Sequence, residues 1–146
     1  MSADYPSMTT AEIRSKFLNF FEERGLKLYP SSSLVPDDPS LLLANAGMNQ
    51  FKEYYQGKKT MKEIGAISCQ KCVRTNDIDC IGEDGRHLSF FEMLGDFSFG
   101  GVSKEQACSW AFELITDVFK LPLDRLYFTV FTDDDETHGI WRSLGI

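Results

Sequence analysis

The stretch from Cys72 to Gly100 constrains this 146-residue chain more than any other segment. An apolar run ends at Arg74, a polar loop rich in Asn, Asp and Gly follows, and Arg86 and His87 then lead into an aromatic run. This pattern predicts an antiparallel pair of strands joined by a loop. Basic groups on such a hairpin can bind phosphates and aromatic rings can bind a base, so the hairpin is a candidate nucleotide site.

Arg74 stands at the end of a predicted buried strand, where a guanidinium is costly unless it meets a carboxylate or a phosphate. Arg86, across the hairpin, is close enough to share its ligand, and such a pair can stabilise charge in phosphoryl or nucleotidyl transfer. Phe90 and Phe91 alternate faces, so one can line the pocket while the other packs. The alternative puts all phenylalanines in the core and pairs both arginines with nearby acids, namely Asp77, Asp79, Glu83, Asp84 or Glu92.

The remaining patterns predict an α+β fold with an antiparallel sheet, because the central strands are joined by a hairpin-length loop. Capping boxes at Thr9 with Glu12 and at Ser103 with Gln106 begin two helices. Further helices are expected at 45–56 and from the acidic run 133–136, which would form the first turn of the last helix. Strands are expected at 64–74, at 86–99 with a bend or bulge near Gly95, and at 126–132.

The net charge and the length of the apolar runs limit the classes of function that this chain can have. The formal net charge of −7 gives no overall basic footprint for nucleic acid. No apolar run reaches the ~18 residues of a membrane span, and the N-terminus has no signal region, so we expect a cytoplasmic protein without membrane contact.

Cysteine spacing raises the question of a zinc site. Cys69 and Cys72 form a C-x-x-C pair, and Cys80 and His87 are the nearest further ligands. A structural zinc site usually takes four ligands in two such pairs. We therefore expect reduced thiols and no zinc, with a zinc-bearing interaction domain as the alternative.

Four strings carry a family resemblance: TAEIRSKFLNFFEERG, SSSLVPDDPSLLLANAGMNQFKEYYQG, CVRTNDID and RHLSFFEMLGDFSFG. Together they resemble, in order from Thr9 to the end of the chain, the N-terminal part of the alanyl-tRNA synthetase family. The resemblance implies a class II aminoacyl-tRNA synthetase fold, an antiparallel sheet flanked by helices and incomplete in this chain. It divides the chain into a flexible leader, 1–8, and the N-terminal part of the catalytic domain, 9–146.

The same resemblance implies the chemistry. Members of that family activate L-alanine with ATP and Mg²⁺ to alanyl-adenylate and transfer alanine to tRNA(Ala). Arg74 would contact the ATP α-phosphate and the alanine carboxylate as the catalytic residue. The other ATP-binding positions would be Asp77, Arg86, His87 and Phe91, with Phe90 as the alternative ring. Met48, otherwise read as a core residue, and Met93 would lie with Arg74 at the amino-acid pocket.

Two departures from the family pattern limit the expectation. Arg74 is followed directly by Thr75, without the glycine pair and lysine of the family's longer loop. The family's second catalytic half, with its alanine-binding tryptophan and aspartate and its motif 3 arginine, has no counterpart, nor have the tRNA-binding and editing parts. We therefore expect a ligase fragment that is inactive or very weak alone and can self-associate through an exposed sheet edge. The alternative is a stand-alone paralogue that acts as a nucleotide-binding or regulatory module.

Overall fold

The computed structural model describes residues 7–76 and 78–146. The chain divides into two compact units. One combines the segment up to Phe20 with the segment from Val102 onward, and the other runs from Phe21 to Gly101. Most of the predicted leader, residues 1–6, lies outside the described residues, as does Asp77.

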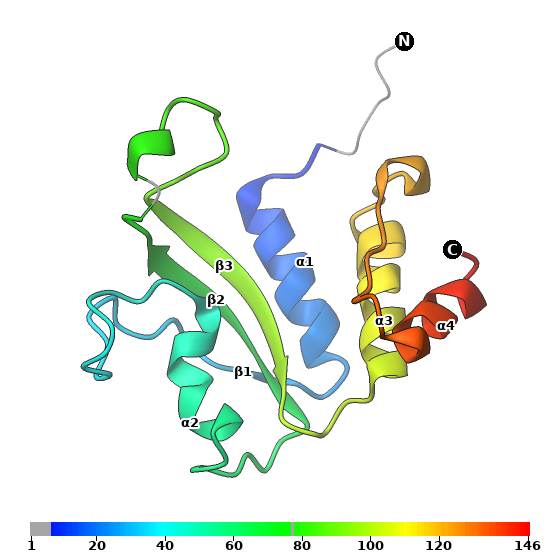
Figure 1. Cartoon of the computed structure of the whole chain (residues 1–146), viewed down its shortest axis with the longest axis horizontal. Helices are drawn as coiled ribbons and strands as arrows, with labels where there is room; N and C mark the ends of the chain where they lie inside the picture. Colours follow the sequence, from blue (N-terminus) through cyan, green and yellow to red (C-terminus); the bar gives the residue numbers. More distant parts are fainter. Residues whose placement is uncertain (1–6, 77) are drawn as a thin grey trace. The chain divides into compact units, whose positions relative to one another are not determined.

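The sheet of the 21–101 unit contains β1 (Lys27–Leu28), β2 (Gly65–Val73) and β3 (Phe90–Ser98), in that spatial order (Figure 1). β2 and β3 pair antiparallel, whereas β1 pairs parallel to β2. The predicted α+β class is confirmed, with a mixed sheet. The parallel pairing is possible because a long crossover separates β1 from β2, and it includes the helical segments η1 (Gly47–Phe51) and α2 (Lys52–Tyr55).

The register of the hairpin differs from the prediction at Gly95. Gly95 lies opposite Ser68 and Asp96 lies opposite Ile67, so the ladder continues and the predicted bulge is wrong. A Cβ atom on Gly95 would come within 2.6 Å of Cζ of Phe97. The missing side chain thus makes room for the Phe97 ring inside a regular strand.

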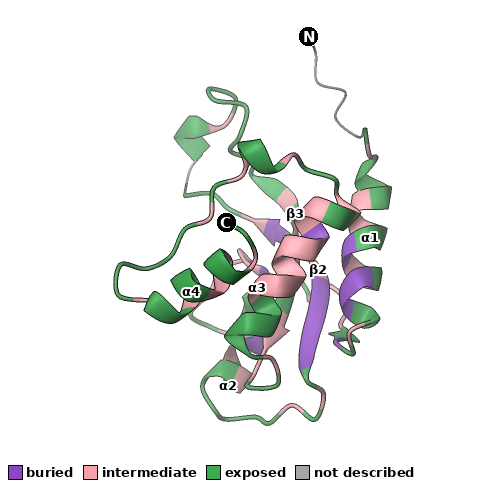
Figure 2. Cartoon of the chain, turned by 90° about the vertical axis from the view of Figure 1, so that its right-hand side faces the viewer, coloured by how far each residue is buried: buried purple, intermediate pink, exposed green. Residues whose placement is uncertain are grey.

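The core of this unit forms where η1 (Gly47–Phe51) packs against β2 and β3. The helix α2 (Lys52–Tyr55) follows η1 directly. Phe51 is 1% exposed, and its ring centroid lies 4.7 Å from that of Phe97 and 5.3 Å from that of Tyr29. β2 is buried along most of its length, as Figure 2 shows in purple. The helix predicted at 45–56 is present from Gly47 to Tyr55, and its first part, η1, is a 3₁₀ helix.

One polar side chain is part of this core. Gln70 is fully buried in β2, and its Oε1 accepts hydrogen bonds from the backbone N–H and hydroxyl of Ser32 and from Nε2 of Gln50. Its Nε2 donates to the carbonyl oxygens of Ser32 and Lys71. The side chain thus joins three segments that are distant in sequence.

In the unit formed by the chain ends, both predicted capping boxes are confirmed. Glu12 Oε2 accepts from the backbone N–H and the hydroxyl of Thr9 at the start of α1 (Thr10–Glu22). Ser103 Oγ accepts from the backbone N–H of Gln106 at the start of α3 (Lys104–Glu113), which continues as the π-helix η3 (Leu114–Val118).

The acidic run begins the last helix of the same unit, as predicted. Asp134 caps α4 (Asp135–Ser143) by accepting from the Thr137 N–H, and Lys104 donates to the same carboxylate. These contacts lower the pKa of Asp134 to about 2, the Thr137 hydrogen bonds being the largest cause. None of the helices in the described ranges is long and apolar enough to cross a membrane.

The predicted strand at 126–132 is wrong. After the short helix η4 (Leu123–Arg125) the backbone runs outside any helix or strand. Phe128 packs on Phe112 and Trp141, with ring centroids 6.1 and 4.9 Å away, while Tyr127 is 94% exposed. The side chains from Leu126 to Thr129 do alternate between half-buried and exposed. Within the described part of the chain, however, no strand pairs with this segment.

Candidate functional site

Arg74 follows β2 directly and continues its pairing by one residue, because its backbone N–H donates to the Ser89 carbonyl at 2.9 Å. In the ladder, Cys72 lies opposite Phe91 and Val73 lies opposite Phe90. Since side chains alternate faces along a strand, Arg74, Cys72 and Phe91 share one face and Phe90 occupies the other. The register thus separates two rings that the sequence could not distinguish.

The Arg74 side chain has contacts on two sides. Its guanidinium carbon lies 5.3 Å from the centroid of the Phe91 ring, a cation–π arrangement. Its Nε donates to the Asn45 carbonyl oxygen at 3.0 Å. Asn45 belongs to the segment before η1, so the arginine connects the hairpin with that segment.

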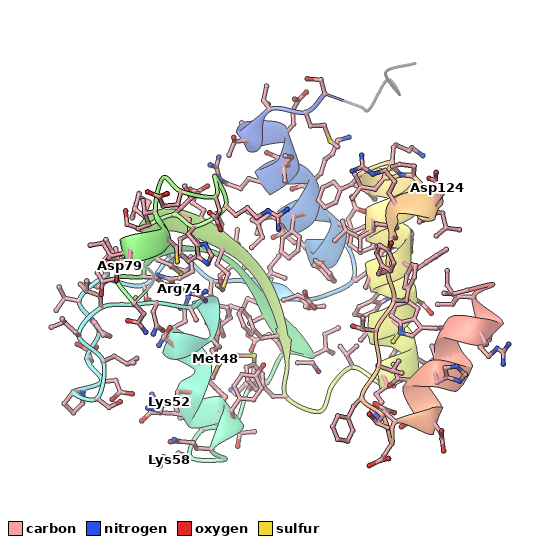
Figure 3. The ribbon with its side chains drawn as sticks, turned by 45° about the horizontal axis from the view of Figure 1, so that its top comes forward. Met48, Lys52, Lys58, Arg74, Asp79 and Asp124 are labelled. Atoms are coloured by element: carbon pink, nitrogen blue, oxygen red, sulfur yellow. The ribbon has the colours of Figure 1, made fainter. Side chains whose placement is uncertain are left out.

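A cavity of about 490 Å³ opens beside Arg74. Its wall consists of the end of β2 with the residues after it and the segment before η1: Ser40, Leu41, Leu42, Leu43, Asn45, Val73, Arg74, Thr75 and Asn76. Figure 3 labels Arg74 at the end of β2 and Met48 on η1. Within the described residues, Nε–H is the one guanidinium donor with a protein acceptor, so no described residue occupies the remaining donors.

The two methionines have different environments. Met93 lies opposite Gln70 in the ladder, and its sulfur accepts a hydrogen bond from the Gly47 N–H at 3.2 Å. Met48, the next residue on η1, is 46% exposed and is therefore not a core side chain. Both stand where η1 meets the hairpin.

Arg86 and His87 lie before β3, in the loop that contains η2 (Ile78–Cys80) and not in the strand itself. Asp84 Oδ1 accepts from the backbone N–H groups of both residues at 2.8 and 3.1 Å, and its Oδ2 lies 2.7 Å from Nδ1 of His87. These hydrogen bonds, those of the Arg86 and His87 N–H groups first, lower the pKa of Asp84 to about 2. The carboxylate thus organises the end of the loop.

The structure brings Arg74 and Phe91 into contact, and the pairings also place Met93 on their face. Arg86 and His87 have their recorded contacts within their own loop, and Asp77 lies outside the described residues. Within those residues, no salt bridge joins Arg74 or Arg86 to Asp79, Glu83 or Asp84. These three acids therefore do not supply the ion pairs of the alternative interpretation, which also named Asp77 and Glu92.

Sequence reasoning did not find Asn45. The residue acts through its backbone carbonyl, so no side-chain pattern could have indicated it. A second cavity, of about 570 Å³, was also not anticipated. Lys52 lines it and forms a 2.6 Å salt bridge with Asp38, which holds the pKa of that carboxyl well below its usual range.

The cysteines show no metal arrangement. None of the four forms a disulfide, and Cys72 is buried, which raises the pKa of its thiol. A buried thiol with a raised pKa is a poor source of the thiolate that zinc requires. Among the described residues, no group of three or more His, Cys, Asp or Glu side chains is placed to hold a metal ion. The expectation of no zinc remains a prediction.

Comparison with known proteins places the chain in one family. Residues 12–146 match the family model described as tRNA synthetases class II (A). The chain is 51% identical over its whole length to an alanine–tRNA ligase of Synechocystis and 50% identical over 94% of its length to that of Pseudothermotoga lettingae. Over 90% of its length it is 53% identical to a rice protein named alanine–tRNA ligase, chloroplastic/mitochondrial.

The chain spans only 13–17% of the length of these relatives. The match nevertheless includes the hairpin with Arg74, the segment before η1 and the helices of both units, since it extends from residue 12 to the end of the chain. The chain therefore belongs to the family of class II (A) tRNA synthetases, and it is similar to the N-terminal part of alanine–tRNA ligases.

Proposed function

We propose that this chain carries the ATP-facing part of the active site of an alanine–tRNA ligase, which activates alanine as alanyl-adenylate and transfers it to tRNA(Ala). One observation carries the proposal: the Arg74 guanidinium is held at Nε, and Arg74 lines a cavity of about 490 Å³. A guanidinium held in this way can offer its planar fork to a phosphate or carboxylate without reorganising.

Arg74 is the proposed catalytic residue. Its free N–H groups would bind the α-phosphate of ATP and the alanine carboxylate, bring the two together and stabilise the charge that develops between them. Bound ATP supplies the adenylyl group, and its Mg²⁺ offsets part of the triphosphate charge. The surroundings of Arg74 fit an anion, because a cation lines the cavity and its other guanidinium N–H groups have no acceptor among the described residues.

The other site residues have supporting roles in this proposal. Phe91 would stack on adenine with the ring face that Arg74 does not cover, and its place on the Arg74 face supports it over Phe90. Arg86 and His87, both exposed, would contact the outer phosphates. Met48 and Met93, where η1 meets the hairpin, would border the alanine pocket. Asp77 remains in the proposed ATP-binding set on the resemblance alone.

Compartment and association belong to the same proposal. We place the protein in the cytoplasm, a reducing compartment, and four cysteines without a disulfide support this. β3 is an edge strand of the described sheet, and an unpaired edge invites strand pairing, so self-association through β3 is also proposed. Sedimentation of a clean monomer at high concentration would argue against that association.

The nucleotide site is tested by NMR titration of the chain with ATP. We expect shift changes at Arg74, Phe91 and the loop containing His87, and we expect Arg74→Lys to weaken ATP binding roughly 10- to 100-fold, as for lost charged hydrogen bonds. Arg142→Lys, in the last turn of α4, is the matched control and should leave binding unchanged. The absence of any shift change at millimolar ATP, or equal affinity of the Arg74→Lys variant, would overturn the proposal.

A further inference from the structure

The contact between Arg74 and the Asn45 carbonyl involves a peptide group that is held at both ends. The carbonyl of Asn45 and the N–H of Ala46 belong to one peptide unit. Arg74 Nε donates a hydrogen bond to the Asn45 oxygen at 3.0 Å. The Ala46 N–H donates to Oδ1 of Asn49 at 2.7 Å. Because the peptide is planar and trans, the two groups point in opposite directions and turn together.

The neighbouring peptides are also fixed. The Ala44 carbonyl accepts from the Val73 N–H at 2.9 Å, and the Ala44 N–H donates to the Leu34 carbonyl at 2.8 Å. On the other side, the Gly47 N–H donates to the Met93 sulfur at 3.2 Å. Rotation of the 45–46 peptide about its flanking bonds is therefore the remaining way to misdirect the Asn45 carbonyl, and the Asn49 side chain opposes that rotation.

Burial strengthens the arrangement at the Asn49 end. Gly47 is buried and Ala46 and Asn49 are half-buried, so water competes poorly for the Ala46 N–H. The accepting atom of Asn49 must be its amide oxygen, because the Ala46 N–H can only donate. A chain of hydrogen bonds thus runs from Asn49 through one peptide to the guanidinium, each bond polarising the next.

We infer that Asn49 is a positioning residue for Arg74 and sets the direction of its guanidinium through the 45–46 peptide. The ligand relevant to this role is the phosphate or carboxylate that the remaining Arg74 donors bind, so the functional half of the inference rests on the proposed function. Asn49 does not line the cavity beside Arg74, so its role runs through the peptide and not through contact with the ligand. Without the Asn49 oxygen, the 45–46 peptide can rotate. The Asn45 carbonyl then turns away, and the Arg74 Nε–H loses its acceptor.

The test compares three variants of the chain. Asn49→Leu and Asn49→Ala remove the acceptor, whereas Asn49→Asp keeps an oxygen in its place. Asn19→Leu, at an exposed position of α1, is the matched control. The first measurement is hydrogen exchange and chemical shift of the Arg74 Nε–H by NMR, which requires no ligand. The second is ATP affinity.

We expect faster Nε–H exchange at Arg74 in the Asn49→Leu and Asn49→Ala variants and exchange near wild type in the Asn49→Asp variant. The two variants with faster exchange should also lose ATP affinity by roughly 3- to 10-fold. Unchanged Nε–H exchange in a folded Leu or Ala variant would overturn the inference, and so would an Asp variant as perturbed as the Ala variant. If wild type does not bind ATP while Nε–H exchange responds as expected, the proposed function fails and the positioning role stands.

Discussion

The Arg74 guanidinium carbon lies 5.3 Å from the centroid of the Phe91 ring, whereas the adjacent ring, Phe90, lies on the opposite face of the hairpin and is 55% exposed. Two residues of the same type, next to each other in sequence, thus have different environments because the strand alternates its faces. They form a natural pair for substitution.

The Phe91→Leu variant should weaken ATP binding, whereas Phe90→Leu should leave it close to wild type. Phe91→Leu removes a cation–π contact of about 0.5–2 kcal/mol and with it one of the two contacts that hold Arg74. Titration calorimetry with ATP, or NMR titration where heats are small, gives the comparison. Equal losses for the two variants would contradict the assignment of faces.

The Gln70→Leu variant should lower the free energy of unfolding by roughly 1–3 kcal/mol, because it leaves the half-buried N–H of Ser32 and the Gln50 amide without their shared acceptor. Urea denaturation measures the change. Gln56→Leu, at an exposed position, is the control and should change the midpoint little. A Gln70→Leu variant as stable as wild type would show that water replaces the lost hydrogen bonds.

Gly65→Ala should be destabilising, whereas Gly139→Ala should be stabilising. A Cβ atom on Gly65 would lie 2.4 Å from the Phe97 backbone oxygen, which cannot move without distorting β3, so a cost of about 1–3 kcal/mol is expected. Nothing lies within 4 Å of a Cβ on Gly139 in α4, where alanine should add about 0.5–1 kcal/mol. Thermal unfolding of both variants checks the opposite signs.

The end of the loop before β3 should respond to acid. The pKa of Asp84 is lowered from 3.8 to about 2, so its stabilising contribution is complete above about pH 4 and is lost as the pH falls towards 2. The amide signals of Arg86 and His87 should follow this protonation in an NMR titration. Asp84→Asn, which keeps an accepting oxygen, should abolish the pH step. A midpoint near 3.8 would mean that these hydrogen bonds are not formed in solution.

Much of the architecture was readable from local signals. Thr9 with Glu12 and Ser103 with Gln106 were correctly predicted to begin helices, because a capping box satisfies backbone donors within four residues of sequence. The hairpin was also predicted, since two apolar and aromatic runs flank a loop rich in turn residues. The prediction of a strand at 126–132 failed, because strand formation needs a partner and alternation alone does not supply one.

The sequence by itself determined the family and, through it, Arg74 as the residue around which the site is built. Only the tertiary structure decided which phenylalanine accompanies Arg74, that the ladder passes Gly95 without a bulge, and that the peptide between Asn45 and Ala46 holds the guanidinium. Register and backbone hydrogen bonds between distant segments decide these features. A peptide carbonyl is the same at every position, so the residue names of a sequence do not record which one an arginine will meet.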